Sequence, residues 1–570
     1  MTKSQDAQSP SQDSIRQLVN LFNQGKPLKV LELSQNLTSR YPKSFILWNI
    51  IGAANNALGK TNKAVKAFEK VIQLNPTYAD GFNNLGATLR DQGKLKEAER
   101  ACTRAIFLNS KYAIAYYNLG NIFKDQNKLK QATEAFQKAI SINPDYMDAL
   151  NNLGIVLQTQ GKMKEALECF TKVLQKNPNS VSAQFNIGNF LKEQGDFSKA
   201  IESFKKALIL DPKYAEAHYN MGNALKEKGD LKEALKAFRQ AVSLKPLFVR
   251  AHHNMGNVLV SLNELDHAAE AYKTVISVEP SHVKAYINLG SVLKNLGKFD
   301  AALAAYKKAR AIEPKNAMIY NNLGNTFREQ GKPKDAIENY EKSIYYEPDN
   351  PTAKHMIAAL KGENTSTAPK EYVERLFDDC AGWFEKSLVN KLRYEVPKTV
   401  VNIVQNQLGI SDLGTVLDLG CGTGLLGVEI REYCEKLEGV DLSASMLQEA
   451  QKKNIYDKID QFDIIEYLAL ETLDFDYYFS LDVFIYVGDL SEIFRLLKSR
   501  SQKKGKLIFS TEHTEKDGFF LETTGRYSHS KKYIEKLCRE HNYEFLHFSM
   551  TNLRKENNIT ILGGIYVLEF

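Results

Sequence analysis

The stretch 416–427 reads Val416-Leu417-Asp418-Leu419-Gly420-Cys421-Gly422-Thr423-Gly424-Leu425-Leu426-Gly427. It predicts an apolar strand that ends in alternating glycines and leads into a helix. A second apolar run ends at Asp441, 23 residues after Asp418. In a parallel α/β sheet, strand ends of this kind meet at the carboxyl edge, where an adenosine-bearing cofactor binds. We therefore expect the chemistry of the chain to lie in this region.

The charge around the glycine loop separates two classes of cofactor. Gly422, Gly424 and Gly427 alone satisfy the G-x-G-x-x-G spacing of dinucleotide sites. Asp418, however, lies inside the strand, and its carboxylate would repel the pyrophosphate of a dinucleotide by roughly several kcal/mol in a partly desolvated cleft. S-adenosylmethionine has no phosphate and carries an ammonium and a sulfonium group, which the acid would attract. The loop therefore predicts S-adenosylmethionine as the cofactor.

This region resembles the class I S-adenosylmethionine-dependent methyltransferases, over roughly the last 200 residues. The resemblance implies a Rossmann-like α/β domain with a seven-stranded sheet that strands at 543–549 and 565–570 complete. It places the loop at the methionine part of the cofactor, Asp418 at its amino group and Asp441 at both ribose hydroxyls. The implied cofactor-binding residues are Asp418, Gly420, Cys421, Gly422, Thr423, Gly424, Asp441, Leu442, Met446, Asp463, Ile464 and Asp482.

A different pattern fills residues 45–350, where nine units of 34 residues follow one another without a slip from Gly52 to Gly324. An alanine follows each of these glycines by twelve residues, and an aromatic residue follows by sixteen except at Cys102. Most units close with proline. Small residues let two helices approach closely and proline ends the second helix, so each unit predicts a helical hairpin. The pattern resembles the tetratricopeptide repeat.

An asparagine stands two residues before the repeat glycine in every unit except the first, which has Ile50. We expect this face of the first helix to line a concave groove, where carboxamides can donate to and accept from a peptide backbone. The column resembles the asparagine ladder of protein O-linked N-acetylglucosamine transferases. The alternative is that each asparagine bonds to the neighbouring repeat. The column comprises Asn84, Asn118, Asn152, Asn186, Asn220, Asn254, Asn288 and Asn322.

The two patterns predict an α-solenoid followed by a Rossmann-like α/β domain. This order is similar to that of bacterial fusions of tetratricopeptide repeats with a methyltransferase. In such fusions an aromatic helix before the sheet often covers the cofactor, although this chain has Cys380 and Ser387 where Tyr and His are usual. A plain packing helix is the alternative. The expected parts are a disordered polar N-terminus at 1–13, a degenerate repeat cap at 14–44, nine repeats at 45–350, a capping helix and linker at 351–370, and the methyltransferase domain at 371–570.

Composition narrows the partners and the compartment. The net charge of +7 is spread over 570 residues, with lysines followed by glutamates at helical spacing, which is typical of solvated helices and argues against nucleic acid. The six cysteines form no C-x-x-C pair, so we expect neither disulfides nor a metal site. No run of about 18 apolar residues predicts a membrane span, and the polar N-terminus predicts no secretion signal. We expect a cytoplasmic protein without membrane contact.

The catalytic residues are less clear from the sequence than the cofactor site. Methyl transfer requires an aligned nucleophile, and it requires a base only when the nucleophile arrives protonated. A segment near the end of the sheet and two neighbouring positions supply polar candidates for catalysis or substrate contact. These candidates are His529, Arg526, Tyr527, His513 and Tyr486.

We therefore expect an S-adenosylmethionine-dependent methyltransferase whose repeats recruit a protein partner or substrate. The chain lacks an Asn-Pro-Pro-Tyr motif of amino-group methylation, which favours an oxygen or carboxylate acceptor. Two alternatives stay open. One is a protein-interaction scaffold with a cofactor-sensing or inactive methyltransferase-like domain. The other is a small-molecule methyltransferase whose repeats serve assembly only.

Overall fold

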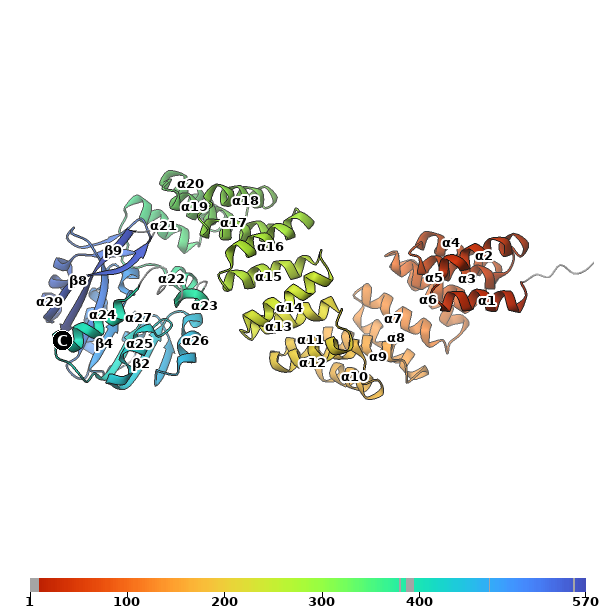
Figure 1. Ribbon diagram of the computed structural model, residues 1–570, viewed down its shortest axis with the longest axis horizontal. Coiled ribbons are helices and arrows are strands. Elements are labelled where there is room, and N and C mark those ends of the chain that lie inside the picture. The colour runs from red at the N-terminus through yellow and green to blue at the C-terminus, as the bar shows by residue number, and fades with distance from the viewer. Residues whose placement is uncertain (1–9, 379–380, 386–393, 471, 557–558) are drawn as a thin grey trace, which may run out of the picture. The chain divides into compact units, whose positions relative to one another are not determined.

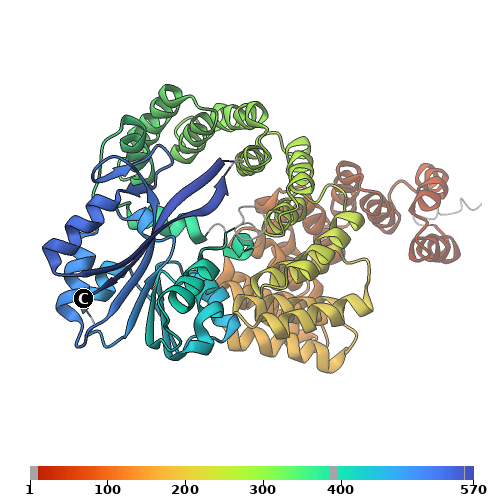
Figure 2. The same ribbon diagram turned by 60° about the vertical axis from the view of Figure 1, so that its left-hand side comes forward.

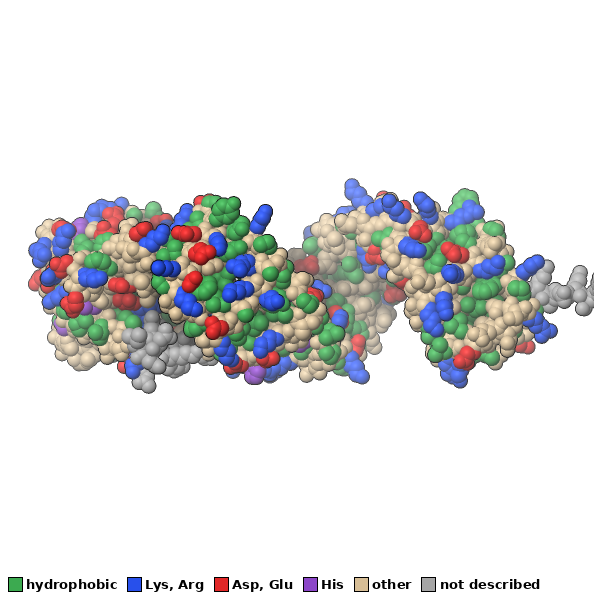
Figure 3. Space-filling model, turned by 90° about the horizontal axis from the view of Figure 1, so that it is seen from above, with side chains coloured by type: hydrophobic (Ala, Val, Ile, Leu, Met, Phe, Trp, Pro, Cys, Tyr) green, Lys and Arg blue, Asp and Glu red, His purple; other side chains and the backbone are tan. Residues whose placement is uncertain are grey.

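A computed structural model describes residues 10–378, 381–385, 394–470, 472–556 and 559–570 (Figure 1). The chain forms two compact units, Met1–Asp230 and Leu231–Phe570, which are described one at a time. None of the helices in the described part of the chain is long and apolar enough to span a membrane. Positive and negative side chains are interspersed on the face drawn in Figure 3, as expected for solvated helices.

The first unit is an array of antiparallel helical hairpins, whose first helix begins inside the N-terminal stretch expected to be disordered. A Cβ atom at Gly154 would lie 2.5 Å from the ring of Phe170, so only glycine permits the close approach of the two helices. The helices are α1 (Gln12–Asn23), α2 (Pro27–Arg40), α3 (Phe45–Ala57), α4 (Thr61–Leu74), α5 (Ala79–Asp91), α6 (Leu95–Leu108), α7 (Ala113–Asp125), α8 (Leu129–Ile142), α9 (Met147–Thr159), α10 (Met163–Lys176), α11 (Val181–Glu193), α12 (Phe197–Leu210) and α13 (Ala215–Glu227).

The asparagine column is bonded between neighbouring repeats. Asn118 Nδ2 donates to Asn83 Oδ1 at 2.8 Å, and Asn186 Nδ2 donates to Asn151 Oδ1 at 2.8 Å. Such bonds between neighbouring repeats are the alternative to peptide binding in the sequence analysis. They explain why asparagine recurs at this position even if the column binds no peptide. Peptide binding by the column, and its likeness to the ladder of the glycosyltransferases, stay predictions.

The second unit begins with further hairpins of the same kind. The last of their helices shares a hydrophobic core with the domain that follows, because Tyr340 and Met356 pack in one cluster with Ile485 and Tyr527. The helices are α14 (Leu231–Leu244), α15 (Val249–Ser261), α16 (Leu265–Val278), α17 (Val283–Asn295), α18 (Phe299–Ile312), α19 (Ala317–Glu329), α20 (Pro333–Tyr346) and α21 (Pro351–Lys361).

The segment that the sequence predicts as a linker is bonded to the following domain along its length. The carbonyl oxygen of Ser366 accepts from the amides of Gly488 at 3.0 Å and Asp489 at 2.8 Å. The amide of Ala368 donates to the carbonyl oxygen of Tyr486 at 3.0 Å. The segment is therefore a seam between the last hairpin and the sheet domain, and it is not a free tether.

The sheet has nine strands, because a short hairpin joins the seven that the sequence predicts. The path β3-β2-β1-β4-β5 is parallel, β9 pairs antiparallel with β5, and β8 pairs antiparallel with β9. The strands are β1 (Gly414–Leu419), β2 (Cys434–Asp441), β3 (Lys458–Gln461), β4 (Tyr477–Ser480), β5 (Lys506–His513), β6 (Phe519–Leu521), β7 (Tyr527–His529), β8 (Glu544–Glu556) and β9 (Ile559–Glu569).

Helices cover both faces of this sheet, and Figure 2 shows the long β8–β9 hairpin in dark blue. Successive side chains of β1 point to opposite faces of the sheet, so Leu417 and Leu419 pack in the core on one face and Val416 packs in the core on the other. The helices are α22 (Lys370–Asp378), α23 (Ala381–Glu385), α24 (Val396–Asn402), α25 (Leu425–Ile430), α26 (Ala444–Lys453), α27 (Ile464–Leu470), α28 (Ser491–Arg500) and α29 (Lys531–His541), with a π-helical turn at Ile403–Gln407 and 3₁₀ turns at Arg431–Tyr433 and Phe484–Tyr486.

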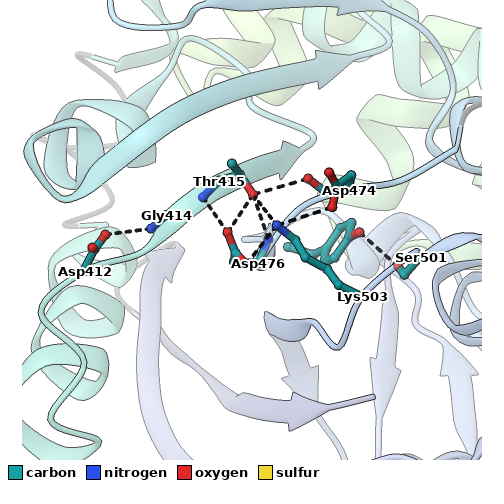
Figure 4. Close-up of polar contacts among 8 residues, drawn as sticks. Asp412, Gly414, Thr415, Asp474, Asp476, Ser501 and Lys503 are labelled. Atoms are coloured by element: carbon teal, nitrogen blue, oxygen red, sulfur yellow. Dashed lines mark hydrogen bonds and ion pairs between the residues drawn. The ribbon is translucent and has the colours of Figure 1, made fainter.

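A polar cluster ties β1 to β4 at their amino ends (Figure 4). Asp476 Oδ2 accepts from the amide of Thr415 at 2.9 Å and from its hydroxyl at 2.8 Å. Lys503 Nζ lies 2.9 Å from Asp476 Oδ1 and 3.4 Å from Asp474 Oδ1. Burial raises the pKa of Asp476, but the bonds from Thr415 and Lys503 outweigh it, and the pKa is lowered overall. The cluster lies at the edge of the sheet opposite to the glycine loop.

We expect an Asp476→Ala variant to lower the free energy of unfolding by roughly 1–3 kcal/mol, because the Thr415 donors lose their acceptor. In the parent chain, the Asp476 carboxylate contributes to the free energy of unfolding at pH values above the unfolded pKa of aspartate, about 3.9. This contribution is lost as the pH falls through the lowered pKa of the folded state. Thermal unfolding at neutral and at acidic pH measures both effects. An equal difference between variant and parent at the two pH values would contradict the role of the carboxylate.

Candidate active site

A cavity of about 750 Å³ opens at the carboxyl ends of β1, β2 and β4. Of the twelve residues that the sequence predicts to bind the cofactor, eleven line this cavity, and Gly424 does not. Gly424 instead caps α25 in a left-handed conformation with φ of 83°. The structure therefore brings together residues that are spread over some 60 positions of the chain, from Asp418 to Asp482.

The glycine loop offers open space and one partnerless hydroxyl to a ligand. At Gly422, with φ of 54°, a Cβ atom would meet nothing within 4 Å. The hydroxyl of Thr423 is buried, lines the cavity and has no hydrogen-bond partner within the described part of the chain. A buried hydroxyl without a partner costs about 1–3 kcal/mol, so the loop is better satisfied when a polar ligand is bound.

Asp441 connects the end of β2 to the glycine loop. Its Oδ2 accepts from the amide of Gly422 at 2.8 Å, and its Oδ1 accepts from the amide of Ser443 at 2.9 Å. Burial raises the pKa of Asp441, while these amide bonds act in the opposite direction. Each carboxylate oxygen can accept more than one bond, so the group can still accept from two ligand hydroxyls.

Asp418 lies below the loop and is almost fully buried. The hydroxyl of Tyr456 donates to Asp418 Oδ2 at 2.7 Å. Burial raises the pKa of Asp418 to about 7, the Tyr456 bond lowers it, and the charge of Asp441 raises it further. A cation beside Asp418 would restore its ordinary ionisation.

Tyr456 is a site residue that sequence reasoning missed. Its ring lies 3.1 Å from the position of a Cβ atom at Gly424 and 2.7 Å from that at Gly427. These glycines therefore make room for the ring that holds Asp418. The sequence carries no signal for this role, because Tyr456 lies in a loop after α26 without any motif of its own.

A buried ionic network forms the wall of the cavity beyond β4. Asp482, with φ of 60°, accepts from Arg554 Nη1 at 2.6 Å. Arg554 also bonds to Glu512, and Arg526 Nη1 lies 3.5 Å from Glu512 Oε1. Only 2 % of the Arg554 side chain is exposed. No motif points to Arg554, which reaches Asp482 from a bulged part of β8 72 residues away.

Two of the five predicted catalytic candidates, Arg526 and Tyr486, line the cavity. The turn that carries Arg526 is held by the last hairpins of the repeats. Arg328 Nη1 donates to the carbonyl oxygen of Thr524 at 3.0 Å, and His355 Nε2 donates to that of Gly525 at 2.9 Å. The repeats thus fix the position of a cavity residue.

The other three candidates lie away from the cavity. His529 is buried and donates through Nε2 to the carbonyl oxygen of Gly488 at 2.9 Å, and burial lowers its pKa to about 4. Tyr527 bonds to the hydroxyl of Thr365 at 2.5 Å. His513 Nε2 lies 3.2 Å from Glu515 Oε1. None of the three lines the cavity. Tyr527 and His529 lie in β7 of the β6–β7 hairpin, and His513 is the last residue of β5.

Helix α22 covers the cavity from the side of the seam. Val373 and Phe377 line the cavity, and Asp378 Oδ1 accepts from the hydroxyl of Ser443 at 2.6 Å. The helix is therefore tied to the loop that follows Asp441. The positions 380 and 387, where the sequence departs from related fusions, lie outside the described residues.

Models of known protein families match both the repeat array and the sheet domain. A family model described as "Methyltransferase domain" matches residues 410–557. A model described as "TPR repeat" matches residues 52–93, 120–161, 188–229, 222–263 and 256–297. Models described as "Tetratricopeptide repeat" match residues 281–344, 148–180 and 169–202.

A curated protein of Geobacillus sp. (strain WCH70), named "Putative methyltransferase GWCH70_2453", is 27% identical over 146 residues. The match covers 25% of this chain, and the chain spans 59% of the length of that relative. Among solved structures, MamA is 33% identical with a TM-score of 0.28, and the match covers 29% of this chain and 95% of MamA. YrrB, a TPR protein "with an unusual peptide-binding site", is 29% identical with a TM-score of 0.28. The match covers 34% of this chain and 98% of YrrB.

Proposed function

We propose that this chain, a tetratricopeptide-repeat protein with a C-terminal methyltransferase domain, transfers a methyl group from S-adenosylmethionine to a carboxylate oxygen of its acceptor. The observation that carries the proposal is the convergence of Asp418, Asp441 and the partnerless hydroxyl of Thr423 on one cavity. These groups fit a cationic ligand with hydroxyls. They fit a dinucleotide poorly, because its pyrophosphate would face buried carboxylates.

When bound, S-adenosylmethionine supplies an electrophilic methyl: the acceptor oxygen bonds to its carbon, the carbon–sulfur bond breaks, and the electron pair stays on sulfur. The residues of the chain hold and orient the reactants. Asp441 can accept from the ribose hydroxyls, Asp418 can pair with the ammonium group, and α22 covers one side of the cavity.

The described residues that line the cavity include no histidine that could serve as a base, which supports an acceptor that needs none. Burial raises the pKa of Tyr486 to about 12, and burial raises that of Tyr394 well above its ordinary value. Asp482 is held in its ion pair with Arg554. A carboxylate is already a nucleophile at neutral pH, whereas an alcohol or an ammonium group would have to lose a proton.

The affinity for S-adenosylmethionine is expected to rise with pH, by up to about tenfold per unit between about pH 5.5 and pH 7. Burial raises the folded pKa of Asp418 to about 7, so below that value the carboxyl is protonated and must ionise to bind the ammonium group. Burial also raises the pKa of Asp441, which adds to the same trend. Calorimetric titrations at a series of pH values measure the slope.

An Asp418→Asn variant is the control for this pH dependence, because its amide does not titrate. Its affinity should be weaker and its pH profile flatter than those of the parent chain. An affinity of the parent that stays constant, or that rises toward acid pH, would contradict the role assigned to Asp418.

The reaction is tested by incubating the full chain with methyl-labelled S-adenosylmethionine and carboxylate acceptors. Methyl esters release their label as methanol in mild alkali, which distinguishes them from methylated amines and ethers. Label that is stable to alkali would contradict the carboxylate acceptor. Cofactor binding without transfer to any acceptor would favour the alternative of a cofactor-sensing scaffold.

A further inference from the structure

Two helices of the repeats form part of the wall of the methyl-transfer cavity. Val260 lines it from α15, and Ser291, Lys294 and Asn295 line it from α17. The three residues of α17 are spaced i, i+3 and i+4, so they lie on one face of the helix. The cavity is therefore bounded on one side by the sheet domain and on another by the repeats.

This face of α17 belongs to the asparagine column. Asn288 stands three residues before Ser291 and seven before Asn295, which places all three along one side of the helix. Asn288 Nδ2 donates to Asn257 Oδ1 on α15 at 3.1 Å, so the two helices present one continuous polar surface. The surface on which an extended peptide backbone can bond is thus continuous with the cavity.

Cations line the cavity both from the repeats and from the sheet domain. Lys294 Nζ lies 3.0 Å from Glu329 Oε1, and 21 % of the lysine side chain is exposed. Arg526 lines the same cavity from the β6–β7 turn, and 25 % of its side chain is exposed. Each cation already pairs with a glutamate, Lys294 with Glu329 and Arg526 with Glu512. A carboxylate that enters between the repeats and the sheet domain would therefore share each cation as a second acceptor.

We propose that the acceptor carboxylate is a side chain of a protein segment that lies in extended form across α15 and α17. In this account the repeats do more than recruit the acceptor at a distance, because Ser291, Lys294 and Asn295 contact the segment beside the reacting group. The inference rests on the proposed function and deepens it by assigning the acceptor to peptide-borne Asp or Glu.

The test compares two sources of the same carboxylate on the full chain. One source is a library of blocked nonapeptides with a single central Asp or Glu, and the other is the matched small acids, such as N-acetylglutamate. Alkali-labile label is measured for the parent chain, for Lys294→Glu and for Lys307→Glu. Lys307 is a matched control, because it is an exposed lysine on the second helix of the same repeat and does not line the cavity. Calorimetry with S-adenosylhomocysteine is run on all three.

We expect members of the peptide library to be labelled at least tenfold faster than the small acids. Lys294→Glu should lower that rate about tenfold or more, with S-adenosylhomocysteine affinity unchanged, and Lys307→Glu should match the parent. Equal labelling of small acids and peptides, or an unaltered Lys294→Glu, would overturn the inference and leave the proposed function standing. Cofactor binding without any labelling would overturn both the inference and the carboxylate acceptor.

Discussion

An Asp441→Ala variant of the full chain is expected to bind S-adenosylmethionine at least about 100-fold more weakly than the parent. Asp441 is the carboxylate that the structure places at the end of β2 and against the glycine loop. Hydrogen bonds to a charged group contribute roughly 1.5–3 kcal/mol each, and about 1.4 kcal/mol is a factor of ten in affinity. Losing two ribose bonds therefore accounts for the expected factor. Calorimetric titration measures it.

Two further variants separate this effect from damage to the loop. Asp441→Asn keeps the shape of the side chain and should lose less affinity than Asp441→Ala. Asp476→Ala removes a carboxylate that accepts from backbone and side chain at the opposite edge of the sheet, and it should bind like the parent. Parent-like affinity of Asp441→Ala would refute the cofactor role of Asp441.

An Arg554→Ala variant is expected to lower the free energy of unfolding by about 3–5 kcal/mol, which is the usual cost of breaking a buried ion pair by removing one partner. Arg554 is the buried cation between Asp482 and Glu512, and its removal leaves two carboxylates without their shared partner. For a unit that spans Leu231–Phe570, the midpoint of thermal unfolding should fall by roughly 4–7 °C. Differential scanning calorimetry of the full chain measures the transition of the second unit.

The network itself supplies the control for this prediction. Adding Glu512→Gln to Arg554→Ala removes one of the charges that Arg554 compensates, so the double variant should recover part of the lost stability. A loss below about 1 kcal/mol in the single variant would mean that Arg554 is not held as described.

The glycine loop and the repeats could be predicted because their signals are local. The loop is defined by residue spacing within one strand, turn and helix. Eleven of the twelve predicted cofactor-binding residues line one cavity. Each repeat hairpin follows from small and large residues at fixed offsets, and Gly154 against Phe170 shows why the offsets are needed. Such patterns require no knowledge of what packs against them.

The acceptor side of the cavity could not be predicted, because it is assembled from distant segments. Arg554 meets Asp482 across 72 positions, and Arg526 is fixed by a turn that Arg328 and His355 hold. His529, a predicted catalytic candidate, does not line the cavity. Residues 527–529 form the strand β7, in which all three residues are buried, and His529 donates to the carbonyl oxygen of Gly488.

The most direct test of the account is a calorimetric titration of the full chain with S-adenosylmethionine, beside a titration with an oxidised nicotinamide dinucleotide. We expect saturable micromolar binding of S-adenosylmethionine, one molecule per chain, and no measurable binding of the dinucleotide. Absence of S-adenosylmethionine binding, or tighter binding of the dinucleotide, would contradict the cofactor on which the proposed function rests.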